Sequence, residues 1–181
     1  MFEFRPNTFE FDLPDQPKIN NSAMLIQRTI NLFNTSRWKA VIEGTKNHLL
    51  RLDRSLLDLS LIPSHQILSR HHGGIKPVSI DKICGTLGRS ADFDHHFHPL
   101  SDRIRDRWVG VAAAHLQNIP LPPVSLIQIR DYYFVQDGHH RISVAHALGE
   151  TAIDAEITIW KVCGSLPWKT LPASHPALRF A

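Results

Sequence analysis

The first part of the chain alternates apolar and polar residues with the period of an α-helix. One set of positions, spaced by three and four residues, comprises Ile19, Ala23, Ile26, Ile30 and Phe33, and a second comprises Trp38, Ile42, Thr45, Leu49, Leu52 and Leu56. The Asn-Thr-Ser run at residues 34–36 supplies a break and a new helix cap between the two sets. We therefore expect a helical hairpin over residues 19–68, preceded by an irregular arm at residues 1–18.

The pattern changes after residues 69–74, where two glycines predict a linker. Short runs rich in valine and isoleucine then predict strands, at residues 77–83, 124–129, 132–136 and 152–160. Ser101 is a good N-cap for one helix, and a second helix begins at Gly138 and ends at Gly149. The pattern thus predicts a compact domain that combines strands and helices after the linker, and a C-terminal tail at 161–181.

Composition narrows the class of protein. With 181 residues, 43% of them hydrophobic and 20% charged, the chain is expected to form a globular core rather than a disordered tail. Cys84 and Cys163 have no ligand-like spacing, which suits a reducing compartment. No apolar run approaches the roughly 20 residues that cross a bilayer, and the N-terminus does not resemble a signal peptide. We expect a cytoplasmic protein with no membrane partner, and its net charge of +3 mildly favours anionic ligands.

The run Asp-Gly-His-His-Arg at positions 137–141 falls where a strand leads directly into a helix. The first N–H groups of a helix lack intrahelical partners, and the helix dipole makes that end positive. Asp137 is placed to cap the helix, and Gly138 lets a ligand oxygen approach the backbone. Arg141 leans back with a fork that suits two phosphate oxygens, and His139 and His140 add donors when protonated. The run indicates a phosphate-binding corner, and ordinary helix capping stays open as the alternative.

The sequence from Pro122 to Ile157 resembles the N-terminal core of the ParB/sulfiredoxin superfamily, and the resemblance extends over about residues 75–160. There a strand pair leads into a G-x-x-R helix start, then an alanine, a leucine–glycine stop and a final strand. In that superfamily the corner binds nucleotide phosphates. The resemblance therefore implies an α+β fold, a small ParB/sulfiredoxin-like mixed sheet with helices, and a nucleoside triphosphate with Mg²⁺. It assigns phosphate contacts to Gly138, His139, His140 and Arg141, with Asp137 capping or orienting.

Three departures from the superfamily limit what the resemblance implies. Sulfiredoxin chemistry needs a cysteine where this chain has His139, so that reaction is excluded. Only 21 residues follow Trp160, which leaves no room for a helix-turn-helix domain, so sequence-specific DNA binding is not expected. A kinase needs a carboxylate to activate a hydroxyl, and because no glutamate lies between Glu43 and Glu150, Asp92 or Asp94 would have to serve.

The loop at residues 85–100 is expected to complete the site. In the superfamily this segment forms a second wall of the nucleotide pocket, so Arg89 would reach a phosphate and Asp92 and Asp94 would hold Mg²⁺. Two alternatives stay open: a transition-metal site, and a loop that is solvated or hydrogen-bonded to itself. The metal site would comprise Asp94, His96, His98 and His139. Further on, three arginines alternate with two aspartates on one helix, which is typical of surface ion pairs, at Asp102, Arg103, Arg105, Asp106 and Arg107.

Two functions are compatible with these residues. The first is a nucleotide-binding protein that works as an NTPase or a small-molecule kinase, which requires Asp92 or Asp94 to face the corner. The second is a non-enzymatic module that binds DNA or protein, which requires a basic face contiguous with Arg141 and no carboxylate within reach of the pocket. Whether the nucleotide is turned over is left open at this point.

Overall fold

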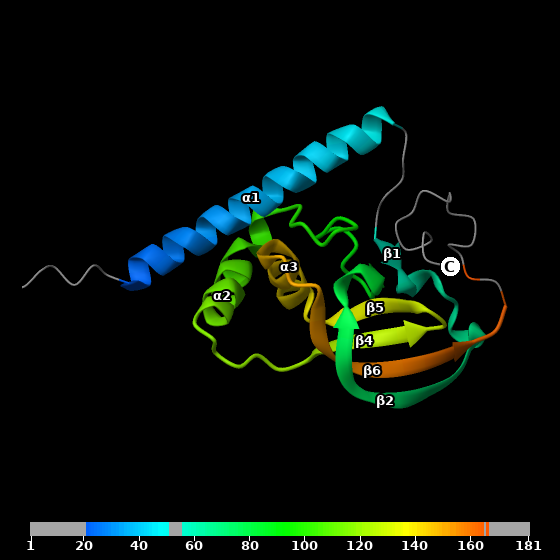
Figure 1. Cartoon of the computed structure of the whole chain (residues 1–181). Coiled ribbons are helices and arrows are strands. Elements are labelled where there is room, and N and C mark those ends of the chain that lie inside the picture. The colour runs from blue at the N-terminus through cyan, green and yellow to red at the C-terminus, as the bar shows by residue number, and fades with distance from the viewer. Residues whose placement is uncertain (1–20, 51–55, 165, 167–181) are drawn as a thin grey trace, which may run out of the picture.

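A computed structural model of the chain describes residues 21–50, 56–164 and 166. It shows an α+β fold in which a six-stranded mixed sheet is combined with three α-helices (Figure 1). The helices are α1 (Asn21–Leu49), α2 (Arg105–Leu116) and α3 (His139–Leu148). The strands are β1 (Leu57–Asp58), β2 (Ile67–Ser79), β3 (Ile83–Thr86), β4 (Val124–Ile129), β5 (Tyr132–Asp137) and β6 (Ala152–Val162). The predicted fold class is confirmed.

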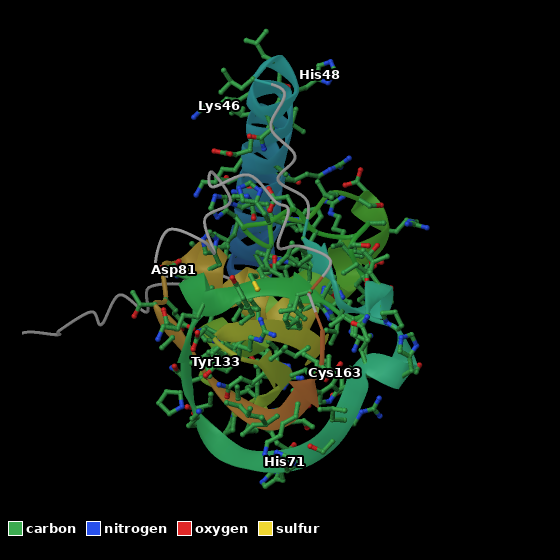
Figure 2. The ribbon with its side chains drawn as sticks, turned by 90° about the vertical axis from the view of Figure 1, so that its right-hand side faces the viewer. Lys46, His48, His71, Asp81, Tyr133 and Cys163 are labelled. Atoms are coloured by element: carbon green, nitrogen blue, oxygen red, sulfur yellow. The ribbon has the colours of Figure 1, made fainter. Side chains whose placement is uncertain are left out.

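The sheet has the strand order β1-β3-β5-β4-β6-β2. The pairs β4–β5 and β2–β6 are antiparallel, whereas β1–β3, β3–β5 and β4–β6 are parallel. Figure 2 shows β2 curving along the edge of the sheet, with His71 on its outer side. Because β3 and β5 run in parallel, the segments that follow them leave the sheet at the same end. One of these segments is the loop that begins after Thr86, and the other is the start of α3.

The predicted helical hairpin at 19–68 is wrong, because α1 is one helix of 29 residues that continues through positions 34–36. The Thr35 hydroxyl donates to the Asn31 carbonyl at 2.9 Å, and Ser36 is buried. Hydroxyl groups that bond within the helix in this way do not interrupt it. Residues 51–55 lie outside the described part, and the chain after them forms β1 and two 3₁₀ turns instead of a second helix.

The predicted linker at 69–74 is also wrong, because these residues belong to β2. The strand pairs with β6 from Ile67 to Ser79, with a register shift between His72 and Ile75 where the two glycines lie. Glycine fits such a bulge, so Gly73 and Gly74, from which a linker was predicted, lie within a strand. The predicted strand at 77–83 is divided by a 3₁₀ turn at residues 80–82. The arm at 1–18 and most of the tail lie outside the described residues.

The helix start predicted at Ser101 and the helix stop predicted at Gly149 are confirmed. The Ser101 hydroxyl accepts from the Arg103 N–H at the start of a 3₁₀ turn that leads into α2. Gly149 ends α3 in the left-handed conformation, and its N–H contacts the carbonyls of Ala145 and His146. Among the described residues, none of the helices combines the length and hydropathy needed to cross a bilayer.

The core lies on both faces of the sheet. Along β4, Val124 and Leu126 belong to one apolar cluster and Ile127 and Ile129 to the other, as the alternation of side chains along a strand requires. The first cluster includes residues of α2 and α3 and the buried Phe33 of α1. The Phe33 ring packs edge-on against Trp108 of α2, and the two ring centroids are 5.5 Å apart. In Figure 1, α1 lies over α2 and α3 and continues beyond them.

Candidate functional site

The joint between β5 and α3 has the conformation that the sequence predicts, but a different cap. Gly138 is the N-cap residue with φ +97°, and as a glycine it has no side chain with which to cap α3. A Cβ at this position would lie 2.5 Å from Cγ1 of Val124, so only glycine fits. The expectation that Asp137 caps the helix is therefore not met. The first N–H groups of a helix have no partner within the helix, and the N-cap residue of α3 supplies none from its side chain.

Arg141 is held by the protein itself. Its Nη1 donates to the carbonyl oxygens of Pro122 and Pro123, the latter at 2.8 Å, and its Nη2 donates to Asp137 Oδ2 at 2.7 Å. Asp137 therefore orients the guanidinium, which was one of its two expected roles. Of the five guanidinium N–H donors, the Nε–H and one Nη2–H are left. Arg141 thus ties the start of α3 to the segment before β4, and it is not the open fork that the sequence suggested.

His139 and His140 are buried beside Phe93. Nε2 of His139 lies 2.6 Å from the Thr86 hydroxyl, and its ring stacks on Phe93. His140 meets the same ring edge-on at 5.5 Å. Burial lowers the pKa of both histidines to about 4, with a further contribution from the positive charge of Arg89. Both rings are neutral at pH 7, so the expected contribution of protonated histidines to anion binding is corrected.

A cavity of about 250 Å³ opens at this joint. Its lining comprises Arg89, Arg107, Val111, Leu121, Pro122, Asp137, Gly138, His139, His140 and Arg141. It thus brings together all five residues of the predicted corner and the predicted loop arginine. Three arginines and one aspartate line it, and because both histidines are neutral, positive charge is in excess by two.

Arg107 is the lining residue that the sequence analysis missed. The expected surface pairing within its helix does not form, because Asp102 pairs with Arg37 of α1 and Arg103 lies 3.8 Å from Asp92. In the described part of the chain, no carboxylate lies within ion-pair distance of Arg107. The signal for its role is its spacing: Arg107 precedes Val111 by four residues, so the two share the face of α2 that lines the cavity.

The loop aspartates do not line the cavity. Asp94 Oδ1 accepts the N–H groups of His96 and His98 at 2.9 and 2.8 Å, and its Oδ2 lies 2.9 Å from Nδ1 of His98. Although burial alone would raise the pKa of Asp94, the hydrogen bond and charge of His98 lower it below its ordinary value. Asp92 lies 3.5 Å from Arg89 Nη1. Their tentative catalytic assignment is thus not supported by their positions.

The self-bonded loop, one of the two alternatives, therefore forms around Asp94. The other alternative, a metal site of Asp94, His96, His98 and His139, does not form as expected. Asp94 and His98 bind each other, and His139 is directed to Thr86.

A larger cavity of about 580 Å³ adjoins the first. The two share four lining residues, Val111, Leu121, Pro122 and Arg141. Apolar side chains of the 118–123 segment and of β6 line the larger cavity, together with Asp154 and with His115 and Glu150, whose Nε2 and Oε1 lie 2.7 Å apart. Arg141 therefore stands between a small basic cavity and a larger one of mixed character.

A comparison with solved structures finds a similar arrangement in sulfiredoxin from Arabidopsis thaliana, with 20% sequence identity and a TM-score of 0.34. The match covers 46% of this chain and 82% of that chain. No protein-family model matches the sequence, and no curated protein matches it either. The match to sulfiredoxin extends over less than half of this chain.

Proposed function

We propose that the cavity at the start of α3 binds the phosphate groups of a nucleotide. The observation that carries the proposal is the convergence of Arg89, Arg107 and Arg141 on one space of about 250 Å³, at a helix N-terminus whose N-cap residue is a glycine. Free backbone N–H groups and the positive end of the helix dipole favour an anion there. Arginine binds phosphate oxygens through charge-assisted hydrogen bonds.

The three arginines have different parts in this proposal. Arg107 has no ion-pair partner among the described residues, and Arg89 has only Asp92 at 3.5 Å, so their donors can turn to a ligand. Arg141 contributes its two remaining donors and holds the wall of the cavity in place through Pro122, Pro123 and Asp137. The principal phosphate ligands are thus Arg89 and Arg107.

The sizes of the two cavities support a nucleotide over a free phosphate. Pockets for small organic molecules usually measure about 300–1,000 Å³. The basic cavity is smaller than this, whereas the adjoining 580 Å³ falls within the range. A ligand with its phosphates beside Arg107 would place its sugar and base against Ile119, Leu121 and Ile153. The resemblance of the sequence to the ParB/sulfiredoxin superfamily points to the same class of ligand, bound with Mg²⁺.

The positions of the carboxylates favour a protein that binds a nucleotide without hydrolysing it. In the basic cavity the only lining carboxylate among the described residues is Asp137, which is engaged by Arg141. A small-molecule kinase is the second candidate, because Glu150 and Asp154 line the adjoining cavity, where a carboxylate could accept the proton of a substrate hydroxyl. Phosphate-transfer assays on the wild type separate the two, since only a kinase transfers phosphate, and Asp154→Asn and Glu150→Gln then show which carboxylate accepts the proton.

The decisive experiment is a calorimetric titration with nucleoside triphosphates, with and without Mg²⁺, on the wild type and on Arg107→Ala. A hydrogen bond to a charged group contributes about 1.5–3 kcal/mol, so the dissociation constant should rise at least about tenfold in the variant. Arg105→Ala is the matched control, since it removes the same charge from the same helix outside the cavity lining. Arg141→Ala is less informative, because it leaves two carbonyls and Asp137 without their partner.

Two results would contradict the proposal. The first is the absence of heat for every nucleotide at millimolar concentration. The second is an equal affinity in Arg107→Ala, Arg105→Ala and the wild type, because binding would then occur elsewhere on the protein.

A further inference from the structure

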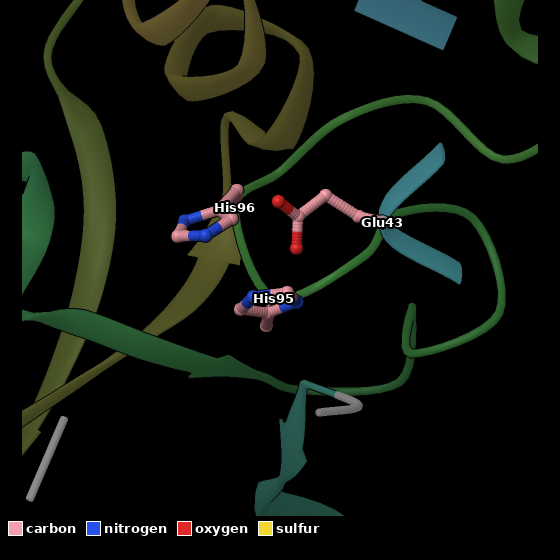
Figure 3. A group of neighbouring side chains, drawn as sticks. All are labelled: Glu43, His95 and His96. Carbon is pink, nitrogen blue, oxygen red and sulfur yellow. The ribbon is translucent and has the colours of Figure 1, made fainter. Parts of the chain in front are cut away.

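A second group of polar side chains lies where α1 passes the loop at residues 87–101. Glu43 comes from α1, and His95 and His96 come from the loop. One carboxylate oxygen and one nitrogen from each ring all lie within 4.8 Å of one another. Figure 3 shows the Glu43 side chain extending from α1 toward the loop that carries His95 and His96. None of the three residues lines either of the cavities described above.

The loop holds the two histidines at the tip of a closed turn. The Asp94 N–H donates to the His98 carbonyl at 3.0 Å, and the Phe97 N–H donates to the Asp94 carbonyl at 2.9 Å. The Asp94 side chain binds two further N–H groups of the turn. On either side of the histidines, Phe93 and Phe97 are buried in the main core. Positions 95 and 96 are therefore fixed by backbone hydrogen bonds and by core packing before any ligand arrives.

Helix α1 brings Glu43 to the same place by its packing. Phe33, Ser36 and Ala40 are buried and follow one another at three and four residues, so they define the face of α1 that meets the body of the protein. Glu43 comes three residues after Ala40 and continues this face. The contact between Phe33 and Trp108 fixes how the helix lies against α2, and hence where the carboxylate reaches.

We infer that Glu43, His95 and His96 form a binding site for a divalent transition-metal ion of the zinc class. Imidazole nitrogens and carboxylate oxygens are the ligands such ions take, at about 2.0–2.2 Å. Ligand atoms around a tetrahedral ion are then about 3.4 Å apart, so small side-chain rotations close the observed group around an ion. Two histidines and one carboxylate leave a fourth position for water.

An ion at this site would link α1 to the loop. The same loop carries Arg89, which lines the basic cavity at the start of α3. Metal binding would therefore fix both the position of α1 and one wall of that cavity. The alternative is an internal contact between the glutamate and the imidazoles that binds no ion.

Cobalt and zinc distinguish these alternatives on the full-length, metal-free protein. Co²⁺ bound by two imidazoles and a carboxylate in a four-coordinate site gives strong visible absorption, and one equivalent of Zn²⁺ should remove it. We expect Glu43→Gln and His95→Ala to weaken Co²⁺ binding at least tenfold. His71→Ala/His72→Ala is the matched control, because it removes another adjacent histidine pair, one that is exposed on β2, and it should bind as the wild type does.

The inference is overturned if the wild type gives only the weak spectrum of hydrated Co²⁺, or if Glu43→Gln and His95→Ala bind as tightly as the wild type. Circular dichroism of the metal-free variants shows whether they fold. Should they not, X-ray absorption of the zinc-loaded wild type decides the question. Scattering from two imidazoles supports the site, and its absence rejects it.

Discussion

Replacing Gly138 by alanine tests why a glycine stands at the joint between β5 and α3. The residue has φ +97°, where an L side chain is strained, and the added Cβ would lie 2.5 Å from Cγ1 and 2.8 Å from Cβ of Val124. Val124 is fully buried in β4, so it has no free space to move into. Both the backbone and the packing therefore oppose the substitution.

The two contributions can be separated with a second glycine. Gly149 also has a left-handed φ, +81°, but no atom lies within 4 Å of the Cβ that an alanine would add. Gly149→Ala should therefore cost only the backbone term, about 1–2 kcal/mol. Gly138→Ala adds overpacking against a buried side chain, about 1–3 kcal/mol, so we expect a total loss of about 2–5 kcal/mol.

Urea unfolding of the two alanine variants and of Val124→Ala supplies the measurement. The double variant Gly138→Ala/Val124→Ala should be more stable than the sum of the two single changes predicts, by about 1 kcal/mol or more, because the smaller side chain leaves room for the new Cβ. The explanation fails if Gly138→Ala loses no more stability than Gly149→Ala. It also fails if the effects at 138 and 124 are additive.

Three further predictions concern the buried polar groups and the docking of α1. Thr86→Val removes the hydroxyl that lies 2.6 Å from His139 Nε2, and it should lower the free energy of unfolding by about 1–3 kcal/mol; an unchanged urea midpoint would show that the contact is not stabilising. Because burial lowers the pKa of His139 and His140 from 6.5 to about 4, the unfolded chain binds more protons between these values. Stability from these groups should therefore be fully present above pH 6.5 and fall as the pH drops toward 4, and urea midpoints across this range should fall less in His140→Gln. Phe33→Ala removes the ring that packs edge-on against Trp108 and should cost about 3–5 kcal/mol; limited proteolysis should then cut α1 first, and an unchanged cleavage pattern would contradict this role.

The strands and helix ends next to the site could be predicted because local sequence determines them. Alternating apolar residues favour the strands β4 and β5, and glycines favour the two ends of α3. The folded chain has the same local structure that these residues favour on their own. The break predicted at residues 34–36 failed for the opposite reason. Thr35 satisfies its hydroxyl within the helix, and Ser36 faces the body of the protein, and neither contact is visible in a sequence pattern.

The set of residues that lines the basic cavity was predicted better than the role of each residue. All five residues of the corner and Arg89 line it, because the strand-to-helix joint places them together. The partners of Arg141 could not be foreseen, since the carbonyls of Pro122 and Pro123 come from a segment about 20 residues earlier. Arg107 was missed because charges of both signs alternate along its helix, and only its four-residue spacing from Val111 distinguishes it from the other arginines.

The two edge strands of the sheet, β1 and β2, determine whether a strand from another copy of the protein can pair with it. At one margin β1 has only two residues. At the other, β2 is long but interrupted by register shifts, contains Pro77, and presents Arg70 and Lys76 to solvent. An incoming strand needs a long, flat and uncharged template to pair with, and neither margin offers one. The register shifts, proline and charges of β2 thus make this edge a poor template for pairing with a further strand.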